Sequence, residues 1–269
     1  MNGFPPDIDR HCSSLRDQGW CVLPGVISPE RAARVRERLD AAAAESRKRG
    51  VDTYMPELDP NDRNIRVFYL LDLDPVFVEL IAHPAALTLV RALLGEGFMI
   101  SNFTANIALP GSRSMAVHSD QALVVPEPWL APWSMNVIWC LGDVHAANGA
   151  TRYVPGSHRW TTLDDVPPDP LAETRPFEAP AGSIIGVDGR LWHTSGANVT
   201  ESEERALLFG YYSMDFLRPQ VNWNAVLRSE TQAGLSDFMR ERLGLGPQAN
   251  VRVGAGILDR GRPGKEHAG

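Results

Sequence analysis

His118 and Asp120 are separated by a single residue, and a further histidine, His193, lies far downstream in a short β-rich run. Residues i and i+2 of a strand point to the same face, so both side chains could reach one metal ion from the inner wall of a barrel. Two histidines and one carboxylate on one side of an iron leave the other side open for substrate and oxygen. The alternative is a satisfied surface pair, because an HxD pattern alone is not specific.

The third ligand is selected among seven histidines by its local context. Two of the remaining histidines lie near the ends of the chain, one precedes a proline in a helical pattern, and two occur in turns: His11, His267, His83, His145 and His158. For His158, capping or surface hydrogen bonding is a sufficient explanation. His193 follows the tight turn Asp188-Gly189 in a short strand pattern, which makes it the best-placed candidate.

Arg205 opens a long apolar run and therefore needs a partner, because a guanidinium group is rarely buried unpaired. A salt bridge to Glu201, Glu203 or Glu204 is one explanation. A bidentate contact with the carboxylate of a co-substrate is the other, for which the planar guanidinium fork is suited.

Several common signatures are absent from the sequence. It contains no GxSxG, GxxxxGK[ST], GxGxxG or HExxH pattern. The simplest hydrolase, nucleotide-binding and zinc-protease interpretations are therefore excluded.

The sequence resembles the phytanoyl-CoA dioxygenase family of Fe(II)/2-oxoglutarate-dependent oxygenases. The resemblance is carried, in the family's order, by Pro110-Gly111, HSDQ at 118–121, NGATRYVPGSH at 148–158, DGRLWHTSGAN at 188–198, Arg205 and LRPQVNW at 217–223. The opening GWCVLP at 19–24 and the helix from Pro29 also match, so the resemblance extends to about Gly244.

The resemblance implies a set of ligands for the cofactors. Iron would be bound by His118, Asp120 and His193, and the distal carboxylate of 2-oxoglutarate by Arg205. Thr151 stands where many members place a hydroxyl near the co-substrate, although a threonine that bonds a turn backbone is the alternative. Asn106 is a further candidate for co-substrate contact. Met115 occupies a position where some relatives carry a polar co-substrate contact, so another group would serve here.

The same resemblance implies the reaction class. With Fe(II), 2-oxoglutarate and O2, the enzyme would oxidise an unactivated C–H bond of a small molecule, such as a natural-product intermediate, and release succinate and CO2. Hydroxylation is the simplest outcome, and desaturation, ring closure and rearrangement are the others. Asp120 argues against halogenation, because related halogenases have a small residue at that position.

Three other functions are compatible with parts of the pattern. A non-oxidative cupin-like metalloenzyme, a hydrolase or an isomerase, could use the same ligands, but it leaves Arg205 unexplained. A non-catalytic jelly-roll protein is disfavoured by the intact set of His118, Asp120, His193 and Arg205. An oligomer-forming structural protein would require a long heptad pattern or an exposed apolar stripe, and neither is seen.

Five residues are candidates for contact with substrate. Arg66 and Phe68 precede the second helix, in a segment that often approaches the active site in this family. Gln121 ends the HSDQ motif, and Trp133 belongs to the Pro-rich stretch 126–133, where a lid would lie. Arg190 could bind an anionic substrate. The tryptophan and the two arginines have structural alternatives, which are burial in the core for the tryptophan and pairing with a nearby aspartate for the arginines.

The elements that must position these residues form a β-rich centre between helices. Ser28 and Pro29 favour a helix that ends near residue 49, and a second helical pattern over 75–95 should break at His83-Pro84. Strands are predicted at 19–24, 98–109, 115–125, 134–141, 150–154, 183–187, 191–194 and 205–214, and a closing helix at 223–243.

The predicted fold class is therefore α+β with a sandwich or barrel, and the resemblance implies a double-stranded β-helix (jelly-roll, cupin-like) core flanked by N-terminal and C-terminal helices. We expect one domain over residues 1–250, with the β-core at about 97–215 and a flexible tail at 251–269.

Composition limits the partners. The 269 residues are 43% hydrophobic and 22% charged, with a net charge of −7, and no basic run exceeds residues 47–49, which argues against nucleic acid. Three cysteines without a CxxC pair fit a reducing cytoplasm. No signal peptide or membrane-spanning apolar run is evident, so a cytoplasmic protein without a membrane partner is expected. The oligomeric state is not predicted.

Overall fold

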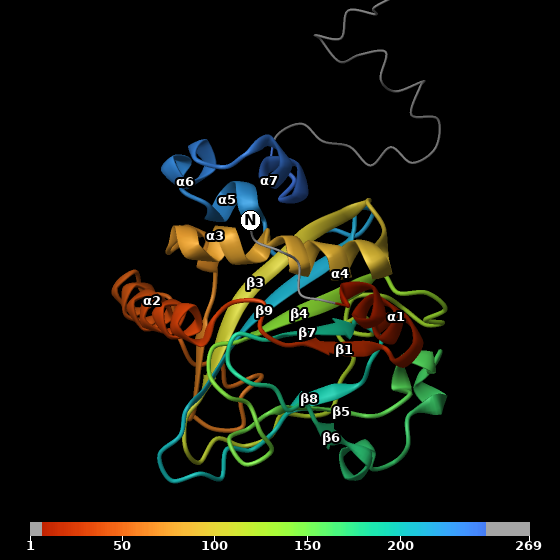
Figure 1. Ribbon diagram of the computed structural model, residues 1–269. Helices are drawn as coiled ribbons and strands as arrows, with labels where there is room; N and C mark the ends of the chain where they lie inside the picture. The colour runs from red at the N-terminus through yellow and green to blue at the C-terminus, as the bar shows by residue number, and fades with distance from the viewer. Residues whose placement is uncertain (1–6, 246–269) are drawn as a thin grey trace, which may run out of the picture.

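The computed structural model describes residues 7–245, in which two antiparallel sheets face each other and helices cover the outer face of the larger one (Figure 1). The larger sheet has the order β1-β7-β4-β9-β3-β2, with β1 (Trp20–Leu23), β2 (Asn64–Val67), β3 (Phe98–Ala108), β4 (Ser134–Cys140), β7 (Ile184–Asp188) and β9 (Arg205–Met214). The smaller sheet has the order β6-β5-β8, with β5 (Thr151–Tyr153), β6 (Arg175–Pro176) and β8 (His193–Ser195).

The helices fall into an N-terminal and a C-terminal group. The first group comprises α1 (Ile8–Gln18), α2 (Pro29–Lys48), α3 (Pro75–Ile81) and α4 (Pro84–Leu94), and the second comprises α5 (Trp223–Val226), α6 (Ser229–Ala233) and α7 (Asp237–Arg242). Short 3-10 turns occur at η1 (Leu70–Asp72), η2 (Ser157–Arg159), η3 (Leu163–Asp165) and η4 (Pro170–Glu173). Figure 1 shows α3 and α4 lying across the larger sheet, with α5–α7 beyond α3.

The predicted starts and breaks of the N-terminal helices are confirmed. The Ser28 hydroxyl accepts the N–H of Arg31 at 3.2 Å and so caps α2. The chain bends by 42° between α3 and α4. His83 precedes the proline that opens α4, and its Nδ1 accepts the N–H of Ala85 at 3.3 Å, which satisfies a free donor of the new helix.

Residues 115–125 do not form the predicted strand. His118 makes one isolated bridge, in which its N–H and carbonyl exchange hydrogen bonds with those of His193 at 2.9 and 2.8 Å. The chain then turns, because the Gln121 N–H bonds the carbonyl of Gly189 and the Val125 N–H bonds that of Gln121. Residues 115–125 therefore form an extended segment followed by a turn, although their composition is typical of a strand.

The predicted closing helix at 223–243 is three short helices instead. Leu227 is extended, because the next residue, Arg228, donates its backbone N–H to Asp72 at 2.9 Å and its Nε at 2.8 Å. Ser236 then starts α7, with its hydroxyl accepting the N–H of Met239. A tertiary contact has overridden the helical pattern.

One α-helix and two strands were not anticipated: α1, β2 and β6. Because β1 and β2 join the larger sheet, the β-structure extends beyond the expected core of residues 97–215. The expected tail at 251–269 lies outside the described residues.

Side chains of the central strands alternate between two buried faces. Val137 of β4 and Leu208 of β9 face the core that α3 and α4 complete, whereas Ile138 and Leu207 face the smaller sheet. Strands buried on both faces read as continuous apolar runs, so polar residues on the inner face are exceptional. These exceptions build the site described below.

Asp72 joins the C-terminal helices to the rest of the fold. Its buried carboxylate accepts hydrogen bonds from Arg228, from Thr231 Oγ1 at 2.7 Å and from Arg49 Nη1 at 3.0 Å. Burial alone raises the pKa of Asp72, but the hydrogen bonds from Arg228 and Thr231 and the charge of Arg228 outweigh it, so the pKa lies below its ordinary value.

We expect Asp72→Asn to destabilise the fold by about 2 kcal/mol at pH 7, because a carboxylate with several charge-assisted hydrogen bonds is lost. A lowered folded-state pKa contributes stability above the unfolded value of about 3.9, and this contribution disappears as pH falls through the folded pKa. The difference between variant and wild type in urea unfolding should therefore shrink at pH 3. Asp40→Asn, in an exposed pair with Arg36, should change stability by less than about 0.5 kcal/mol. An equal effect of the two substitutions would contradict this role of Asp72.

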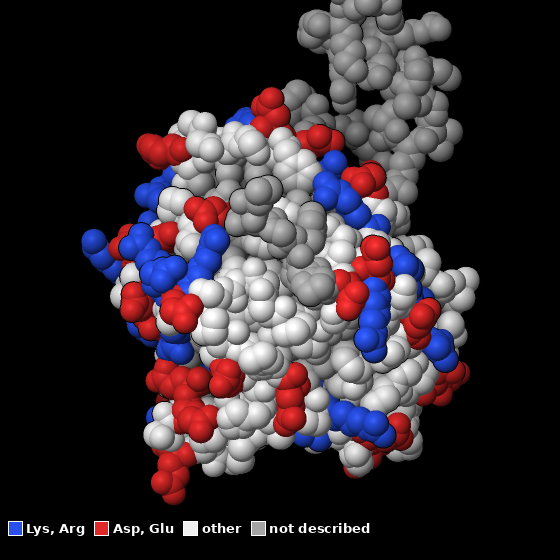
Figure 2. Space-filling model, viewed as in Figure 1, with Lys and Arg blue, Asp and Glu red and all other residues white. Residues whose placement is uncertain are grey.

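Within residues 7–245 no single helix is long and apolar enough to cross a membrane, and only the bent pair α3 and α4 passes that test on length and composition together. The apolar side chains of that pair, among them Phe77 and Leu89, are buried in the core. On the face shown in Figure 2, acidic and basic side chains are mixed around an uncharged centre.

Candidate active site

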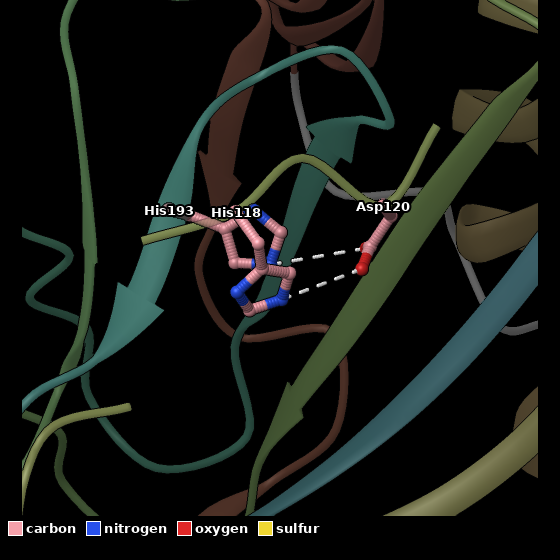
Figure 3. Close-up of side chains that lie close together, drawn as sticks. All are labelled: His118, Asp120 and His193. Atoms are coloured by element: carbon pink, nitrogen blue, oxygen red, sulfur yellow. Dashed lines mark ion pairs between the residues drawn. The ribbon is translucent and has the colours of Figure 1, made fainter. Parts of the chain in front are cut away.

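His118, Asp120 and His193 converge between the two sheets (Figure 3), and their potential ligand atoms all lie within 4.8 Å of one another. Nε2 of His118 lies 3.7 Å from Asp120 Oδ1, and Nε2 of His193 lies 3.8 Å from Asp120 Oδ2. These separations are too long for hydrogen bonds. They leave room for one ion to be shared by two imidazole nitrogens and a carboxylate.

The backbone brings the two histidines together through the His118–His193 bridge, which joins the HxD segment to β8. Ser119 points away, and its hydroxyl donates to the carbonyl of Gly189 at 2.8 Å. Gly189 itself has no room for a side chain, because a Cβ there would lie 2.0 Å from the hydroxyl oxygen of Ser134. Although the strand expected here is absent, His118 and Asp120 do reach the same side.

Hydrogen bonds to backbone carbonyls set the tautomer of both imidazoles. Nδ1 of His118 lies 3.0 Å from the carbonyl oxygen of Ala116, and Nδ1 of His193 lies 2.9 Å from that of Leu191. A carbonyl only accepts, so each Nδ1 carries the hydrogen and each Nε2 keeps its lone pair for a metal. Burial lowers the pKa of His193, which favours the neutral ligand form.

Arg205 is buried and lacks a carboxylate partner among the described residues. Its Nε donates to the carbonyl of Gly149 at 2.9 Å, and Nη1 donates to Asn106 Oδ1 at 3.1 Å, but Nη2 has no hydrogen-bond partner. Glu203 pairs with His145 and Glu204 pairs with Arg36, and Arg205 forms no salt bridge with the three glutamates that the sequence offered as alternative partners.

The charge of Arg205 is therefore available to an anion. Burial and the neighbouring charge of Arg66 lower the pKa of Arg205 to about 10, which still leaves it protonated near neutral pH. A buried cation with an unused N–H is expected to bind a carboxylate, which supplies both the missing charge and the missing acceptor. The site therefore fits 2-oxoglutarate, as the donor set described above fits iron.

Thr151, Asn106 and Arg66 line the same pocket. Nδ2 of Asn106 is buried without a partner, so this side chain has a donor to offer in addition to its contact with Arg205. Arg66 is held by Asp59, to which it donates two hydrogen bonds at 2.7 and 2.8 Å, and its Nη2 also contacts the sulfur of Met115 at 3.1 Å.

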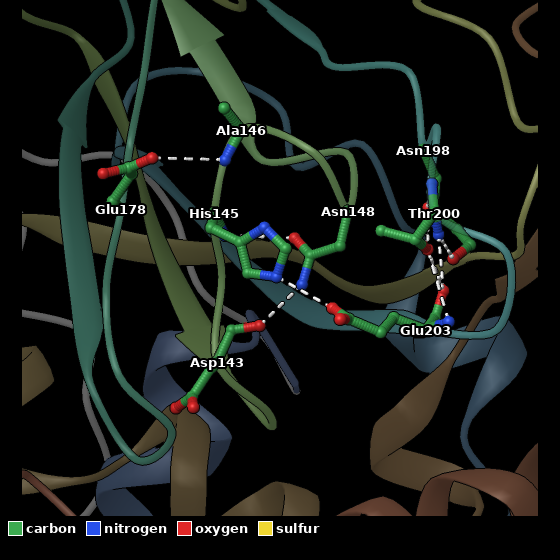
Figure 4. A network of polar contacts seen from close by, with 9 residues as sticks. Asp143, His145, Ala146, Asn148, Glu178, Asn198, Thr200 and Glu203 are labelled. Atoms are coloured by element: carbon green, nitrogen blue, oxygen red, sulfur yellow. Dashed lines mark hydrogen bonds and ion pairs between the residues drawn. The ribbon is translucent and has the colours of Figure 1, made fainter.

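A polar network holds the segments that carry Gly149 and Arg205 (Figure 4). Asn148 and Asn198 face each other in a backbone bridge, and Asn198 Nδ2 donates to the carbonyl of Glu203 at 2.7 Å. These contacts join the residues before Gly149 to those before Arg205. Gly149 has a φ of 90°, where a side chain would be strained.

The pocket has a volume of about 230 Å³ and is lined in part by His118, Asp120, His193 and Arg205. Several lining residues were not identified from the sequence: Leu58, Asn102, Thr104, Leu123, Asn136, Ser195, Phe209, Tyr211 and Gln220. The period of two along each strand could have identified some of them, because Phe209 and Tyr211 lie on the same face of β9 as Arg205. Phe68, a predicted substrate contact, also lines the pocket.

Gln121, Trp133 and Arg190, which were predicted to contact substrate, do not line this pocket. Gln121 is fully buried and joins two loops, since its Nε2 donates to the carbonyl of Ala131 at 2.9 Å and its Oε1 accepts the N–H of Trp133 at 2.7 Å. Arg190 pairs with Asp188 at 2.7 Å, so its charge is already satisfied.

Comparison with solved structures identifies the fold. The structure of HygX from Streptomyces hygroscopicus, with nickel and 2-oxoglutarate bound, is similar with a TM-score of 0.62 and 18% identity over 78% of this chain and 88% of that chain. The α-ketoglutarate-dependent epimerase SnoN from nogalamycin biosynthesis is similar with a TM-score of 0.63 and 20% identity over 84% and 89%. The predicted jelly-roll fold with flanking helices is thereby confirmed.

Comparison with sequences identifies the family. The model of the family described as phytanoyl-CoA dioxygenase (PhyH) matches residues 15–206. A protein named dioxygenase af480, from Aspergillus fumigatus, is 51% identical over 231 residues, which are 86% of this chain and 75% of that relative. The chain therefore belongs to the phytanoyl-CoA dioxygenase family, and it is an iron- and 2-oxoglutarate-dependent dioxygenase.

Proposed function

We propose that this dioxygenase oxidises, most simply by hydroxylation, an unactivated C–H bond of an uncharged small molecule. His118, Asp120 and His193 hold Fe(II), Arg205 binds the distal carboxylate of 2-oxoglutarate, and Thr151 and Asn106 add contacts to this co-substrate. One observation chiefly supports this proposal. The unpartnered Nη2 of Arg205 and the three converging ligand residues lie in the same pocket.

The residues of the chain act by binding and orientation. When bound, iron, 2-oxoglutarate and O2 supply the oxidising power, with release of succinate and CO2. Arg205 and Asn106 fix one end of the co-substrate at the inner end of the pocket. The side chains of the pocket wall displace bulk water and hold the substrate beside the metal ligands.

The charges of the pocket favour an uncharged substrate. Among the described residues the charged groups that line it are Arg66, Asp120 and Arg205. Arg66 is neutralised by the buried Asp59, and the other two are assigned to iron and 2-oxoglutarate. A charged substrate would be left without a counter-ion, which is costly in a partly enclosed site.

The remaining wall combines apolar side chains with a few amide and hydroxyl groups. Phe68, Leu123 and Phe209 are among the apolar residues, and Asn102 and Thr104 are among the polar ones. Such a surface suits an aliphatic or aromatic molecule with one or two oxygen functions. A biosynthetic intermediate of this kind fits better than an acyl-CoA, whose phosphates need basic side chains.

Two measurements on the wild-type protein test this proposal. Anaerobic addition of Fe(II) and then 2-oxoglutarate should give the weak visible absorption of the chelate, and admission of air should then give succinate. Omission of Fe(II) or of oxygen should stop succinate formation. If neither the absorption band nor succinate is observed at millimolar 2-oxoglutarate, the proposed site is not an iron and 2-oxoglutarate site.

Substrate class is tested separately. Uncharged lipophilic compounds and anionic compounds of similar size are compared for their ability to accelerate succinate release by the iron-loaded enzyme. Stimulation by uncharged compounds alone is expected. Stimulation confined to anionic compounds would contradict the assignment of the pocket charges.

A further inference from the structure

Asp120 is held by a residue that the sequence did not identify. Nδ2 of Asn136 donates a hydrogen bond to Oδ2 of Asp120, and both side chains line the pocket. Asn136 belongs to β4, between β7 and β9, where it lies opposite Val187 and Tyr211. Asp120, by contrast, stands at the start of a turn outside both sheets. The strand residue therefore positions the carboxylate of the turn residue.

The orientation of the Asn136 amide is determined by the same contact. Its Oδ1 is buried without a partner in the described structure, and only 8% of the residue is exposed. Rotation of the amide by half a turn would place this oxygen against the carboxylate oxygen of Asp120, and two acceptors repel each other. The amide therefore keeps its N–H directed at Asp120.

The two oxygens of Asp120 consequently differ. Oδ1, which lies near Nε2 of His118, accepts no hydrogen bond from Asn136, whereas Oδ2, which lies near Nε2 of His193, does. A carboxylate oxygen that accepts a hydrogen bond has a lone pair engaged by it, so it is a poorer metal ligand than an oxygen that accepts none. Asn136 thus distinguishes two oxygens that would otherwise be equivalent.

We propose that Asn136 is a positioning residue that makes Asp120 a ligand through one oxygen only. This inference rests on the proposed iron site. A carboxylate bound through both oxygens would occupy one further coordination position and reduce the space for the co-substrates. The hydrogen bond from Asn136 withholds the second oxygen and keeps the open face of the site open.

Co(II) is the probe for this proposal, because its visible absorption weakens as the coordination number rises. The test variant is Asn136→Leu, which keeps the size of the side chain but has no N–H to donate. Because the carboxylate of Asp120 is then no longer held in position, we expect the Co(II) dissociation constant, measured by titration calorimetry, to rise by about 10- to 100-fold. Its Co(II) absorption should fall relative to that of the wild type.

The matched control is Asn102→Leu. Asn102 lines the same pocket but donates to Gln220 rather than to Asp120, so Co(II) affinity and absorption should stay within about twofold of the wild type. If Asn136→Leu does not fold, as judged by circular dichroism, Asn136→Ala is the second variant, because it has no N–H to donate and adds neither a charge nor a metal ligand. It should also alter the Co(II) spectrum.

His118→Ala separates the two proposals. In one outcome His118→Ala loses Co(II) binding, but the Asn136 variants keep the wild-type affinity and spectrum. That outcome would overturn the role of Asn136 and support the metal site. Wild-type Co(II) binding by His118→Ala would overturn the metal site, and this inference would fall with it. Weakened binding and an altered spectrum in Asn136→Leu alone, beside an unchanged Asn102→Leu, would support the positioning role.

Discussion

Replacing His193 by alanine is expected to lower succinate formation at least about a thousandfold. Metal sites of this kind gain several kcal/mol from each ligand, so removal of one should weaken Fe(II) binding by about 10²–10³-fold. With only two protein ligands, the ion also lacks a fixed position and coordination geometry. The measurements are the absorption of the anaerobic 2-oxoglutarate chelate and the rate of succinate release in air.

The control for this substitution is His11→Ala. His11 lies on α1 and does not line the pocket, so both readouts should match those of the wild type. Unfolding curves of the two variants show whether either change acts through stability. Wild-type succinate formation by His193→Ala, at the same Fe(II) concentration, would mean that the metal is bound elsewhere.

Arg205→Met is expected to raise the KM for 2-oxoglutarate by about 10²–10³-fold, because loss of one partner of a buried charge pair costs about 2–5 kcal/mol. Arg205→Lys keeps the charge but loses the planar fork and the contacts to Gly149 and Asn106, so an intermediate effect of about tenfold is expected.

The stability of the Arg205→Met protein distinguishes a binding role from a structural one. Without co-substrate the variant should be at least as stable as the wild type, because methionine fills a similar volume and an uncompensated buried charge is removed. Added 2-oxoglutarate, with Fe(II) present, should raise the melting temperature of the wild type and not that of the variant.

Arg152→Met is the matched control. Arg152 lies on β5 beside Thr151, but its guanidinium donates to the hydroxyl and carbonyl of Thr174 and does not line the pocket. Its KM for 2-oxoglutarate should stay within about twofold of the wild type. An equal rise in KM for both arginine variants would remove the specific role assigned to Arg205.

The contacts around Arg205 show how folding selects between two explanations of one residue. From the sequence, a salt bridge to a glutamate and a clamp on a co-substrate were both possible. In the fold, the partly exposed Glu203 and Glu204 pair with His145 and Arg36, while Arg205 is buried. The choice between the two explanations depends on which face of β9 lies inside the fold. Tertiary packing decides that.

What the sequence determined by itself is local. The capped start of α2, the break before Pro84, most of the strands and the HxD pair with its distant histidine all follow from short-range rules of backbone geometry and spacing. The family resemblance extended these patterns to a jelly roll, an iron site and a 2-oxoglutarate site.

Only the tertiary structure decided which polar groups form their hydrogen bonds with partners inside the fold. Gln121 and Arg190 are satisfied by Ala131, Trp133 and Asp188, whereas Asn136 reaches Asp120 from a strand sixteen residues away. Likewise, Arg228 breaks the expected C-terminal helix because Asp72, 156 residues earlier, lies beside it. Such partners meet through sheet register and packing, and no periodicity within a single segment encodes them.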